Sequence, residues 1–233
     1  MGLARWSGLC VSLFLFLPAA PAFGDSRPTS GDASMLSGRT LGVGEVMLGA
    51  ALGWPAFWGQ VVLAPSSELN FGIRGGVLLG SPILGLGSGI GGDVAIPVRW
   101  HPWGSGMLDL SLWIEPRGAF GEGAIVGEEG TFADNFGYAL QLEVGVVLGA
   151  HVSDSVTLIL GAGGGAAFIS VPDAVGQPDH IVGTMLGILG IEFLMRRDLM
   201  LFLEARGGYG LAPEFLFDGH EIIRASLGIA HLL

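Results

Sequence analysis

The chain has 233 residues, a formal net charge of −11 at pH 7, 42 glycines and a single cysteine. All ten basic residues are arginines. Nucleic acid is a poor partner for such a chain, because affinity for phosphates comes from clustered positive charge. The hydrophobic share of 50% is high for a soluble protein, and the length favours one domain.

The first 24 residues have the pattern of a secretory signal peptide. Arg5 supplies a positive start, and an apolar run follows over residues 9–17. This run is too short to span a bilayer as a helix, so we predict a cleaved signal, with a retained anchor as the alternative. Cleavage would remove Cys10, and the mature chain would then need no disulfide. Two small-residue cleavage sites follow the run, Ala20-Pro21-Ala22 and Ala22-Phe23-Gly24.

The segment over residues 25–39 is polar and contains proline, glycine, serine and threonine without any periodicity. Such a composition is typical of a flexible linker. We therefore predict a signal peptide over 1–24, a flexible polar leader over 25–39 and one strand-rich domain over 40–233.

Beyond residue 40, apolar and polar residues alternate with a period of two, which indicates β-strands. The clearest run is 108–117, and the runs 69–77 and 199–206 repeat its pattern. One face of each run is apolar, while the other carries charges of both signs. Behind a secretion signal, this alternation predicts a barrel that turns its apolar face to lipid. The predicted fold class is all-β, an antiparallel up-and-down transmembrane β-barrel.

Short and longer connections alternate along the chain, as in an outer-membrane barrel with short periplasmic turns and long outer loops. We place Trp54–Phe57 among the longer connections. The pattern predicts about ten strands, with both termini on the periplasmic side, and the loss of one hairpin would give eight. The predicted strands cover 41–53, 58–64, 69–80, 89–101, 107–120, 137–152, 156–169, 180–195, 199–210 and 220–233.

A bundle of membrane helices is the competing interpretation, since residues 181–195 are apolar except for Glu192. However, no run after the signal reaches the roughly 18 residues, free of charges and helix breakers, that a spanning helix needs. Arg99, Arg117 and Arg206 also fall within runs, where a helix facing lipid tolerates them poorly. The period of two therefore favours the barrel.

Turning the apolar set outward leaves a charged set that faces the lumen. A narrow barrel has little interior space, so these side chains are expected to pair and to fill the lumen. An ion-selective channel lining is the functional alternative. The predicted lumen charge network consists of Glu45, Arg74, Asp93, Arg99, Asp109, Glu115, Arg117, Glu143, Glu204, Arg206 and Arg224, and Asn70, Gln141 and Glu192 share its face.

Glycine-rich runs at 87–92 and 161–165 lie inside predicted strands, where glycine lets a sheet bend or admits a bulky lumen neighbour. Both runs match a loose G-x-G-x-x-[G/A] pattern, but a dinucleotide site needs a helix to follow. Pro97 and Pro172 would end such a helix early. We therefore predict no nucleotide site and no cofactor.

Aromatic residues gather near the predicted strand ends, and amphipathic rings prefer the level of the lipid headgroups. Packing in a soluble core would not require this placement. The predicted aromatic girdle contains Trp54, Trp58, Trp100, Trp103, Tyr138 and Tyr209.

The last predicted strand carries the most specific resemblance to a known family. Over residues 223–233, apolar residues alternate with small or polar ones up to the last residue of the sequence. This is similar to the C-terminal signal of small bacterial outer-membrane β-barrel proteins of the OmpA type, which the whole of 40–233 resembles. The usual last residue is aromatic, whereas here it is Leu233, and His231 breaks the apolar series. The resemblance implies an outer-membrane location, contact with its lipids, assembly by the barrel assembly machinery and a monomeric state, but no activity.

The sequence contains no G-x-S-x-G, no H-E-x-x-H and no cysteine pair. One constellation could carry chemistry, a rim site of His180, His220 and Glu221, because a histidine beside a carboxylate can act as a general base or hold a metal. The two histidines start strands that are not predicted neighbours, and no nucleophile motif accompanies them. We therefore predict no enzyme and no metal site.

The predicted outer loops carry only acidic charges, which argues against direct capture of lipid phosphates and leaves bridging by divalent cations open. The sequence thus predicts a non-enzymatic outer-membrane barrel with a charged, mostly filled lumen, in a structural or surface-interaction role. A narrow channel or carrier of small solutes is the second hypothesis, and a rim-active hydrolase is the third. The acidic loop residues are Glu122, Glu128, Glu129, Asp134, Asp173, Asp179, Glu214 and Asp218.

Overall fold

The protein is described by a computed structural model that covers residues 34–36, 39–83, 89–126, 134–172, 180–211 and 220–233. The predicted signal peptide and most of the predicted leader lie outside these ranges, so their assignment stays a prediction.

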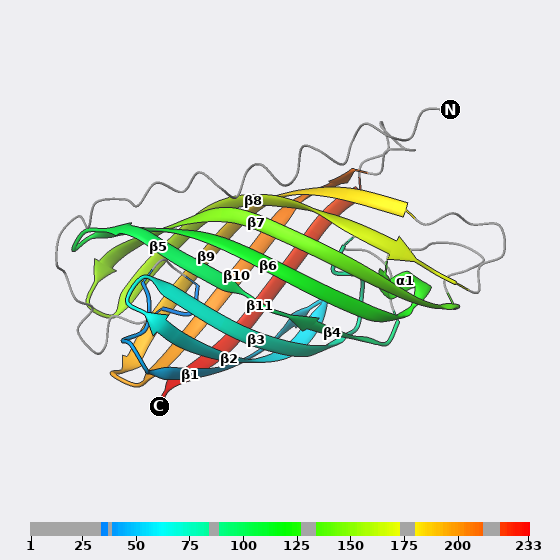
Figure 1. The fold of residues 1–233 in the computed structure, drawn as a ribbon. Helices are drawn as coiled ribbons and strands as arrows, with labels where there is room; N and C mark the ends of the chain where they lie inside the picture. Colours follow the sequence, from blue (N-terminus) through cyan, green and yellow to red (C-terminus); the bar gives the residue numbers. More distant parts are fainter. Residues whose placement is uncertain (1–33, 37–38, 84–88, 127–133, 173–179, 212–219) are drawn as a thin grey trace.

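Eleven strand segments form one antiparallel sheet that closes on itself as a barrel (Figure 1). Neighbours in sequence pair with each other except for the fourth and fifth segments, and the first segment also pairs with the last, which closes the barrel. The segments are β1 (Val46–Trp54), β2 (Ala56–Ser66), β3 (Leu69–Leu78), β4 (Gly91–Ala95), β5 (Val98–Gly104), β6 (Leu108–Glu122), β7 (Phe136–Ser153), β8 (Val156–Ser170), β9 (His180–Arg196), β10 (Leu199–Leu211) and β11 (His220–Leu232).

The segments β4 and β5 are two halves of one strand, because both lie between β3 and β6. Pro97 lies between the halves and lacks the N–H group that a ladder needs. Within the described ranges the barrel therefore has ten strands around its circumference. The prediction of an antiparallel up-and-down barrel with about ten strands is confirmed, and the alternative of eight strands is wrong. The helical interpretation of residues 181–195 is also wrong, because this run lies within β9.

The short connections gather at one end of the barrel, which we call the turn end. The start of β1 and the end of β11 also lie there, since the Leu233 N–H donates to the Val46 carbonyl at 2.9 Å. The opposite end, the loop end, carries the longer connections and the one-turn helix α1 (Gly123–Val126). None of the described residues forms a helix with the length and apolarity required to cross a bilayer.

One connection at the loop end is shorter than predicted. Only Pro55 separates β1 from β2, and the ladder already pairs Leu52 with Phe57. The expected longer connection over Trp54–Phe57 is therefore wrong, because strand pairing continues almost to the proline.

The first strand begins later than predicted, at Val46 instead of residue 41. Residues 42–45 form a turn, in which the Glu45 N–H donates to the Gly42 carbonyl at 2.9 Å. The Glu45 carboxylate accepts from the Gly42 N–H at 2.7 Å. Leu41, just before this turn, is fully buried.

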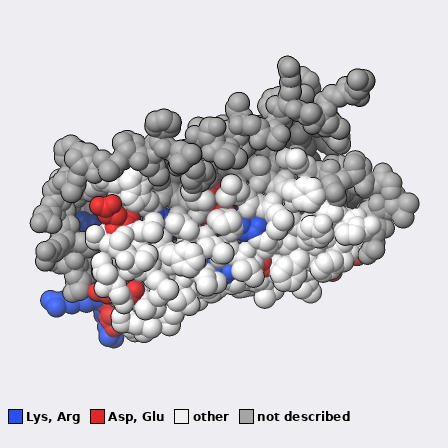
Figure 2. All heavy atoms as spheres, in the orientation of Figure 1, with Lys and Arg blue, Asp and Glu red and all other residues white. Residues whose placement is uncertain are grey.

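The outward face of the barrel is apolar along the strands. In β6 the exposed Leu108 and Leu112 alternate with the buried Asp109, Ser111 and Trp113. Figure 2 shows a mostly uncharged described face, with acidic and basic atoms gathered at the end that carries Arg196 and Asp198. An apolar outer band with a polar interior is the arrangement of membrane barrels, and it sets the inward residues apart as the candidate site.

A charge placed on the outward face tests this assignment. Leu189 lies near the middle of β9 and is 60% exposed, whereas Val152 lies near the turn end of β7 and is 59% exposed. We expect Leu189→Arg to destabilise the barrel in lipid vesicles by about 2–4 kcal/mol, because it places a charge near the bilayer midplane. Val152→Arg is the matched control and should cost about 0–1 kcal/mol. Urea unfolding in vesicles measures both, and equal costs would contradict the assigned lipid face.

Candidate functional site

The lumen is filled in three layers along the barrel axis. A charged layer in the middle separates two clusters of buried apolar side chains, one toward each end. The turn-side apolar layer includes Met35, Leu36, Leu41, Met47, Val62, Trp113, Met200 and Phe202. The loop-side apolar layer includes Leu78, Ile83, Ala119, Ile125, Ile169 and Val182. The charged layer comprises Arg74, Asp93, Glu115, Arg117, Glu143, Glu204, Arg206 and Arg224.

Like charges lie directly opposite each other on both walls of the charged layer. Glu115 is paired in register with Glu143 across β6 and β7, and Arg206 with Arg224 across β10 and β11. Such cross-strand pairs repel. The repulsion is offset across the lumen, because Glu143 lies 2.8 Å from Arg224 Nη1 and 3.5 Å from Arg206 Nη1. The two walls therefore stabilise each other only in the closed barrel.

Glu115 has its own pair of arginine partners. One of its oxygens accepts from Arg74 at 2.5 Å and from Arg117 at 2.7 Å. Arg117 Nε also lies 3.7 Å from Asp93. The network thus extends over β3, β4, β6, β7, β10 and β11 and links most of the circumference.

Aromatic rings cover the turn side of the charged layer. The Arg74 guanidinium lies 5.5 Å from the ring centroid of Trp58, and that of Arg206 lies 5.2 Å from the ring of Trp113. These are cation–π distances. The inward-facing Gly145 and Gly163 leave room for Trp113, since a Cβ on either would come within 3.0 Å of its ring. This agrees with the expectation that strand glycines admit bulky lumen neighbours.

The structure places eight of the eleven predicted lumen residues in the charged layer and three elsewhere. Glu45 caps the turn before β1 and has no place in the charged layer. Asp109 joins a separate cluster at the turn end. Arg99 lies within electrostatic range of Glu204 and Glu192, on the turn side of the layer.

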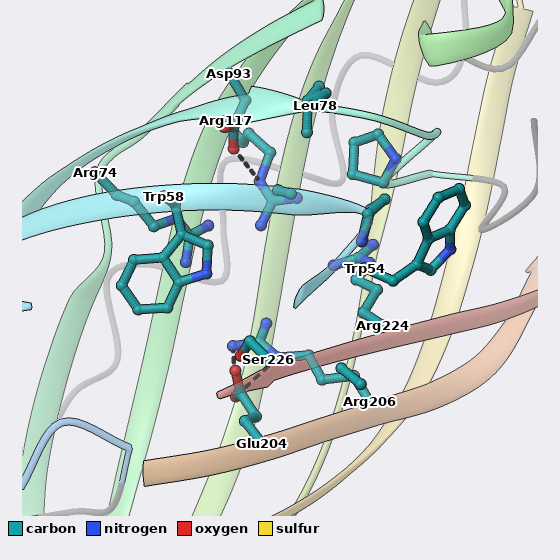
Figure 3. A pocket seen from close by; sticks show the side chains of 14 residues that line it. Trp54, Trp58, Arg74, Leu78, Asp93, Arg117, Glu204, Arg206, Arg224 and Ser226 are labelled. Carbon is teal, nitrogen blue, oxygen red and sulfur yellow. Dashed lines mark hydrogen bonds and ion pairs between the residues drawn. The ribbon is translucent and has the colours of Figure 1, made fainter. Parts of the chain in front are cut away.

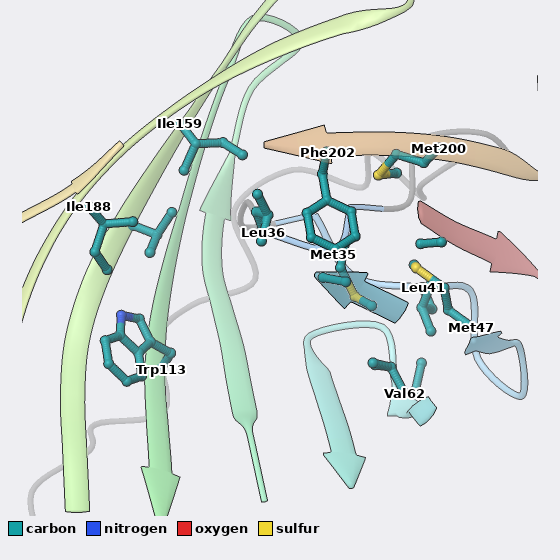
Figure 4. Packing of buried hydrophobic residues seen from close by; sticks show 14 residues of the cluster. Met35, Leu36, Leu41, Met47, Val62, Trp113, Ile159, Ile188, Met200 and Phe202 are labelled. Carbon is teal, nitrogen blue, oxygen red and sulfur yellow. The ribbon is translucent and has the colours of Figure 1, made fainter. Parts of the chain in front are cut away.

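Part of the predicted flexible leader is packed inside the barrel. Met35 and Leu36 are 3% and 5% exposed and lie against the turn-side layer, together with Leu41 (Figure 4). The prediction of a flexible leader over 25–39 is therefore wrong for residues 34–36. The physical reason is that two large apolar side chains interrupt the polar composition at this point, and the lumen buries both.

A single carboxylate holds this segment. Glu192 accepts hydrogen bonds from the Met35 N–H at 2.8 Å, the Leu36 N–H at 2.6 Å and the Ser34 hydroxyl at 2.6 Å. Glu192 is itself 3% exposed. Gly49 leaves the space that Met35 fills, because a Cβ there would overlap the Met35 methyl group. We call this arrangement the Glu192 latch.

Two buried isoleucines fill the loop side of the lumen. Ile83 comes from the connection between β3 and β4, and Ile125 comes from α1. Both are fully buried and pack with Leu78 and Ile169. Each end of the described lumen is therefore narrowed by a segment that is not part of the barrel wall.

A polar cluster lies at the turn end, where the sequence alone did not predict a site. His151 Nε2 lies 2.5 Å from Asp109, and its Nδ1 lies 2.8 Å from the Thr157 hydroxyl. His151 and Thr157 line a cavity of about 490 Å³, which Ser34, Arg39 and Glu192 also line. Serine hydrolase triads place the hydroxyl on Nε2 and the carboxylate on Nδ1, which is the reverse order. The cluster satisfies its buried polar groups and is not assigned a catalytic role.

The structure places four of the six residues of the predicted aromatic girdle at exposed positions. Trp54, Trp103, Tyr138 and Tyr209 are 39–55% exposed near strand ends. Trp100 is half-buried in β5.

Trp58 does not belong to the girdle. Its ring points inward and stacks on Phe202, with 5.8 Å between ring centroids. The alternation in β2 turns Phe57 outward and therefore Trp58 inward.

The predicted rim site is not assembled by strand pairing. His180 and His220 begin β9 and β11, and β10 lies between these strands. Their side chains lie outside the described part of the chain, and Glu221 is exposed. Among the described residues, no three His, Cys, Asp or Glu side chains form a group that could hold a metal ion. Of the acidic outer-loop residues, only Glu122 and Asp134 are described.

No family model and no curated protein sequence matches the chain. Several solved outer-membrane barrels share its general architecture at low identity. The N-terminal β-barrel domain of Pseudomonas aeruginosa OprF has 10% identity and a TM-score of 0.36, over 81% of this chain and 96% of that one.

Two further solved structures match this chain with similarly low identity and TM-score. Yersinia pestis Ail, the attachment invasion locus protein, has 14% identity and a TM-score of 0.38, over 82% of this chain and all of that chain (100%). The Escherichia coli outer membrane protease OmpT has 7% identity and a TM-score of 0.42, over 81% of this chain and 93% of that one. No residue role is transferred from these proteins.

Removing the shared carboxylate of the charged layer should weaken the barrel strongly. In Glu143→Gln, Arg206 and Arg224 lose a buried counter-charge, so we expect a loss of about 3 kcal/mol in the free energy of unfolding. The double variant Glu143→Gln/Arg224→Gln should recover part of this loss. The control Asp198→Asn breaks the exposed pair with Arg196 and should cost no more than about 1 kcal/mol. Urea unfolding followed by tryptophan fluorescence gives all three values, and a Glu143→Gln cost no larger than the control would refute the cross-lumen pairing.

The Glu192 latch can be tested by hydrogen exchange. In Glu192→Ala the Met35 and Leu36 amides lose their acceptor, so their exchange should rise by at least about tenfold. Thr184→Ala removes another buried, inward-facing side chain of β9 and should leave these two amides protected. Amide exchange of the folded barrel, read by mass spectrometry, compares the two variants. Unchanged protection in Glu192→Ala would show that burial alone holds the segment.

Proposed function

We propose that this chain is a bacterial outer-membrane β-barrel with a sealed lumen and a structural or surface-interaction role. The observation that carries the proposal is the three-layer filling of the lumen. A conducting barrel needs a continuous wet path, whereas a filled interior is typical of small barrels. The described lumen instead places a paired charged layer between two apolar layers.

The membrane location is supported by the exposed side chains. Leu140, Leu160 and Ile223 lie on three different strands, are 57–61% exposed and all point outward. Water would disfavour so extensive an apolar surface, whereas lipid would not. A closed barrel also leaves no unpaired sheet edge, as a membrane-spanning sheet requires. Export through the predicted signal peptide is consistent with this location.

No enzymatic role is proposed. The described polar cluster that most resembles a catalytic group, Asp109–His151–Thr157, has the reversed order noted above. The lumen is filled, and the outward face is apolar and suited to lipid. The loop end and its acidic segments are therefore the surface that remains for contact with other molecules or with the cell exterior.

A narrow channel is the second candidate, and one observation favours it. The turn-side layer is completed by residues 34–36, which lie outside the barrel wall and are held largely by one carboxylate. A segment attached in this way is more easily displaced than a strand. Release of this segment alone would not open the lumen, because the charged layer lies behind it.

Planar-bilayer recording distinguishes the two candidates. We expect purified wild-type protein to give no steady single-channel conductance. The variant Trp58→Ala/Phe202→Ala removes a stacked ring pair from the turn-side layer but leaves the charged layer intact, and it should stay silent. Adding Arg206→Ala, which breaches the charged layer, and Ile83→Ala, which opens the loop-side layer, should allow conductance, since all three layers are then breached. Steady conductance from the wild type would contradict the proposal and favour the channel.

A further inference from the structure

A small pocket lies on the loop side of the charged layer and is surrounded by arginines (Figure 3). Its volume is about 50 Å³, which exceeds the roughly 10–15 Å³ that one water molecule requires. Four guanidinium side chains line it, from β3, β6, β10 and β11: Arg74, Arg117, Arg206 and Arg224. The carboxylates of Asp93 and Glu204 line the same space, as do Trp54 and Ser226.

The hydrogen-bond donors of this pocket exceed the acceptors that the protein offers them. Arg224 is 7% exposed, and its contact with Glu143 is an ion pair at 2.8 Å through Nη1. Among the described residues, the Nε and Nη2 groups of Arg224 have no hydrogen-bond partner, and Nη1 has only the contact with Glu143. The Nε groups of Arg74 and Arg117 are buried and equally unmatched. Leaving such donors unpaired is costly, above all on a charged group.

The acidic side chains of the layer are already shared. Glu115 serves both Arg74 and Arg117 through one oxygen, and Glu204 pairs with Arg206. In the described part of the pocket, the unmatched groups are five N–H-bearing nitrogens of Arg74, Arg117 and Arg224 against one unmatched acceptor, Asp93 Oδ1. Arginine has no acceptor function. The species that best satisfies them accepts several hydrogen bonds and carries negative charge.

We propose that this pocket is a binding site for a small inorganic anion of about halide size. Arg224 supplies the central donors, and Arg117 and Arg206 add positive charge from the opposite and the neighbouring wall. The volume is too small for a nucleotide or a sugar. Pro55 and Pro82, from two loop-end connections, also line the pocket, so the anion would enter from the loop end. The site does not depend on whether the barrel conducts.

The line width of chloride-35 in nuclear magnetic resonance measures the binding, with the full-length protein folded in zwitterionic micelles. Exchange with a protein site should broaden the chloride signal, and bromide should compete. Arg224→Gln should weaken the competable broadening by about tenfold or more, since a charge-assisted donor is lost. The control Arg196→Gln removes an exposed arginine of the β9–β10 turn and should leave the broadening unchanged.

A second variant covers the case in which Arg224→Gln does not fold. Ser226→Asp keeps every arginine and adds a carboxylate at the pocket wall, so it should fold and should abolish the competable broadening. Crystals soaked in sodium bromide locate the ion, with an anomalous peak expected within hydrogen-bond reach of Arg224. Retained broadening in Ser226→Asp, or water alone in the pocket at high bromide, would overturn the proposal.

Discussion

The barrel depends on charge pairing across its lumen. Glu143 on β7 faces Arg206 and Arg224 on β10 and β11, while Glu115 on β6 pairs with Arg74 on β3 and with Arg117 on its own strand. Each wall carries one like-charged pair in register, Glu115 with Glu143 and Arg206 with Arg224, and in an open sheet only same-strand partners, Arg117 and Glu204, would offset this repulsion. Closure turns the repulsion into attraction in a poorly hydrated interior, where ion pairs are strong but only if both partners are present. The polar core therefore specifies the closed form over any flat one.

The two apolar layers complete this arrangement by limiting water at the charges. In a soluble protein the apolar residues would form one continuous core. Here the largest apolar surface is outside, and along the barrel axis the interior changes from apolar to charged and back to apolar. The inward Trp58, Trp113 and Phe202 form the boundary between the turn-side layer and the arginines. Rings suit this boundary because one face can pack against aliphatic groups while the other accepts a cation.

The alternation of residue types was enough to predict most of the fold. The period of two located the strands, and the outward or inward facing of Leu112 and Glu115 followed from it. Sequence periodicity did not separate lumen aromatics from girdle aromatics, because Trp58 near a strand end satisfies both patterns. Sequence periodicity also missed the Glu192 latch. The contact between residues 35 and 192 forms only when the barrel is closed, and no pattern in the neighbouring sequence predicts it. The cluster of His151 with Thr157 was missed because neither residue belongs to a known motif.

The Glu192 latch ties together positions that are far apart in the chain. Met35 and its acceptor are 157 residues apart in sequence, so bringing them together early would cost about 2 kcal/mol more chain entropy than closing a hairpin. Its hydrogen bonds can form only once β9 stands in the wall beside the cavity that receives the segment. Contacts between residues so far apart in the sequence form late in folding. The hydrogen-bonded latch therefore indicates that the barrel has assembled completely. In a folding intermediate that lacks β9, the side chains of Met35 and Leu36 would still be exposed.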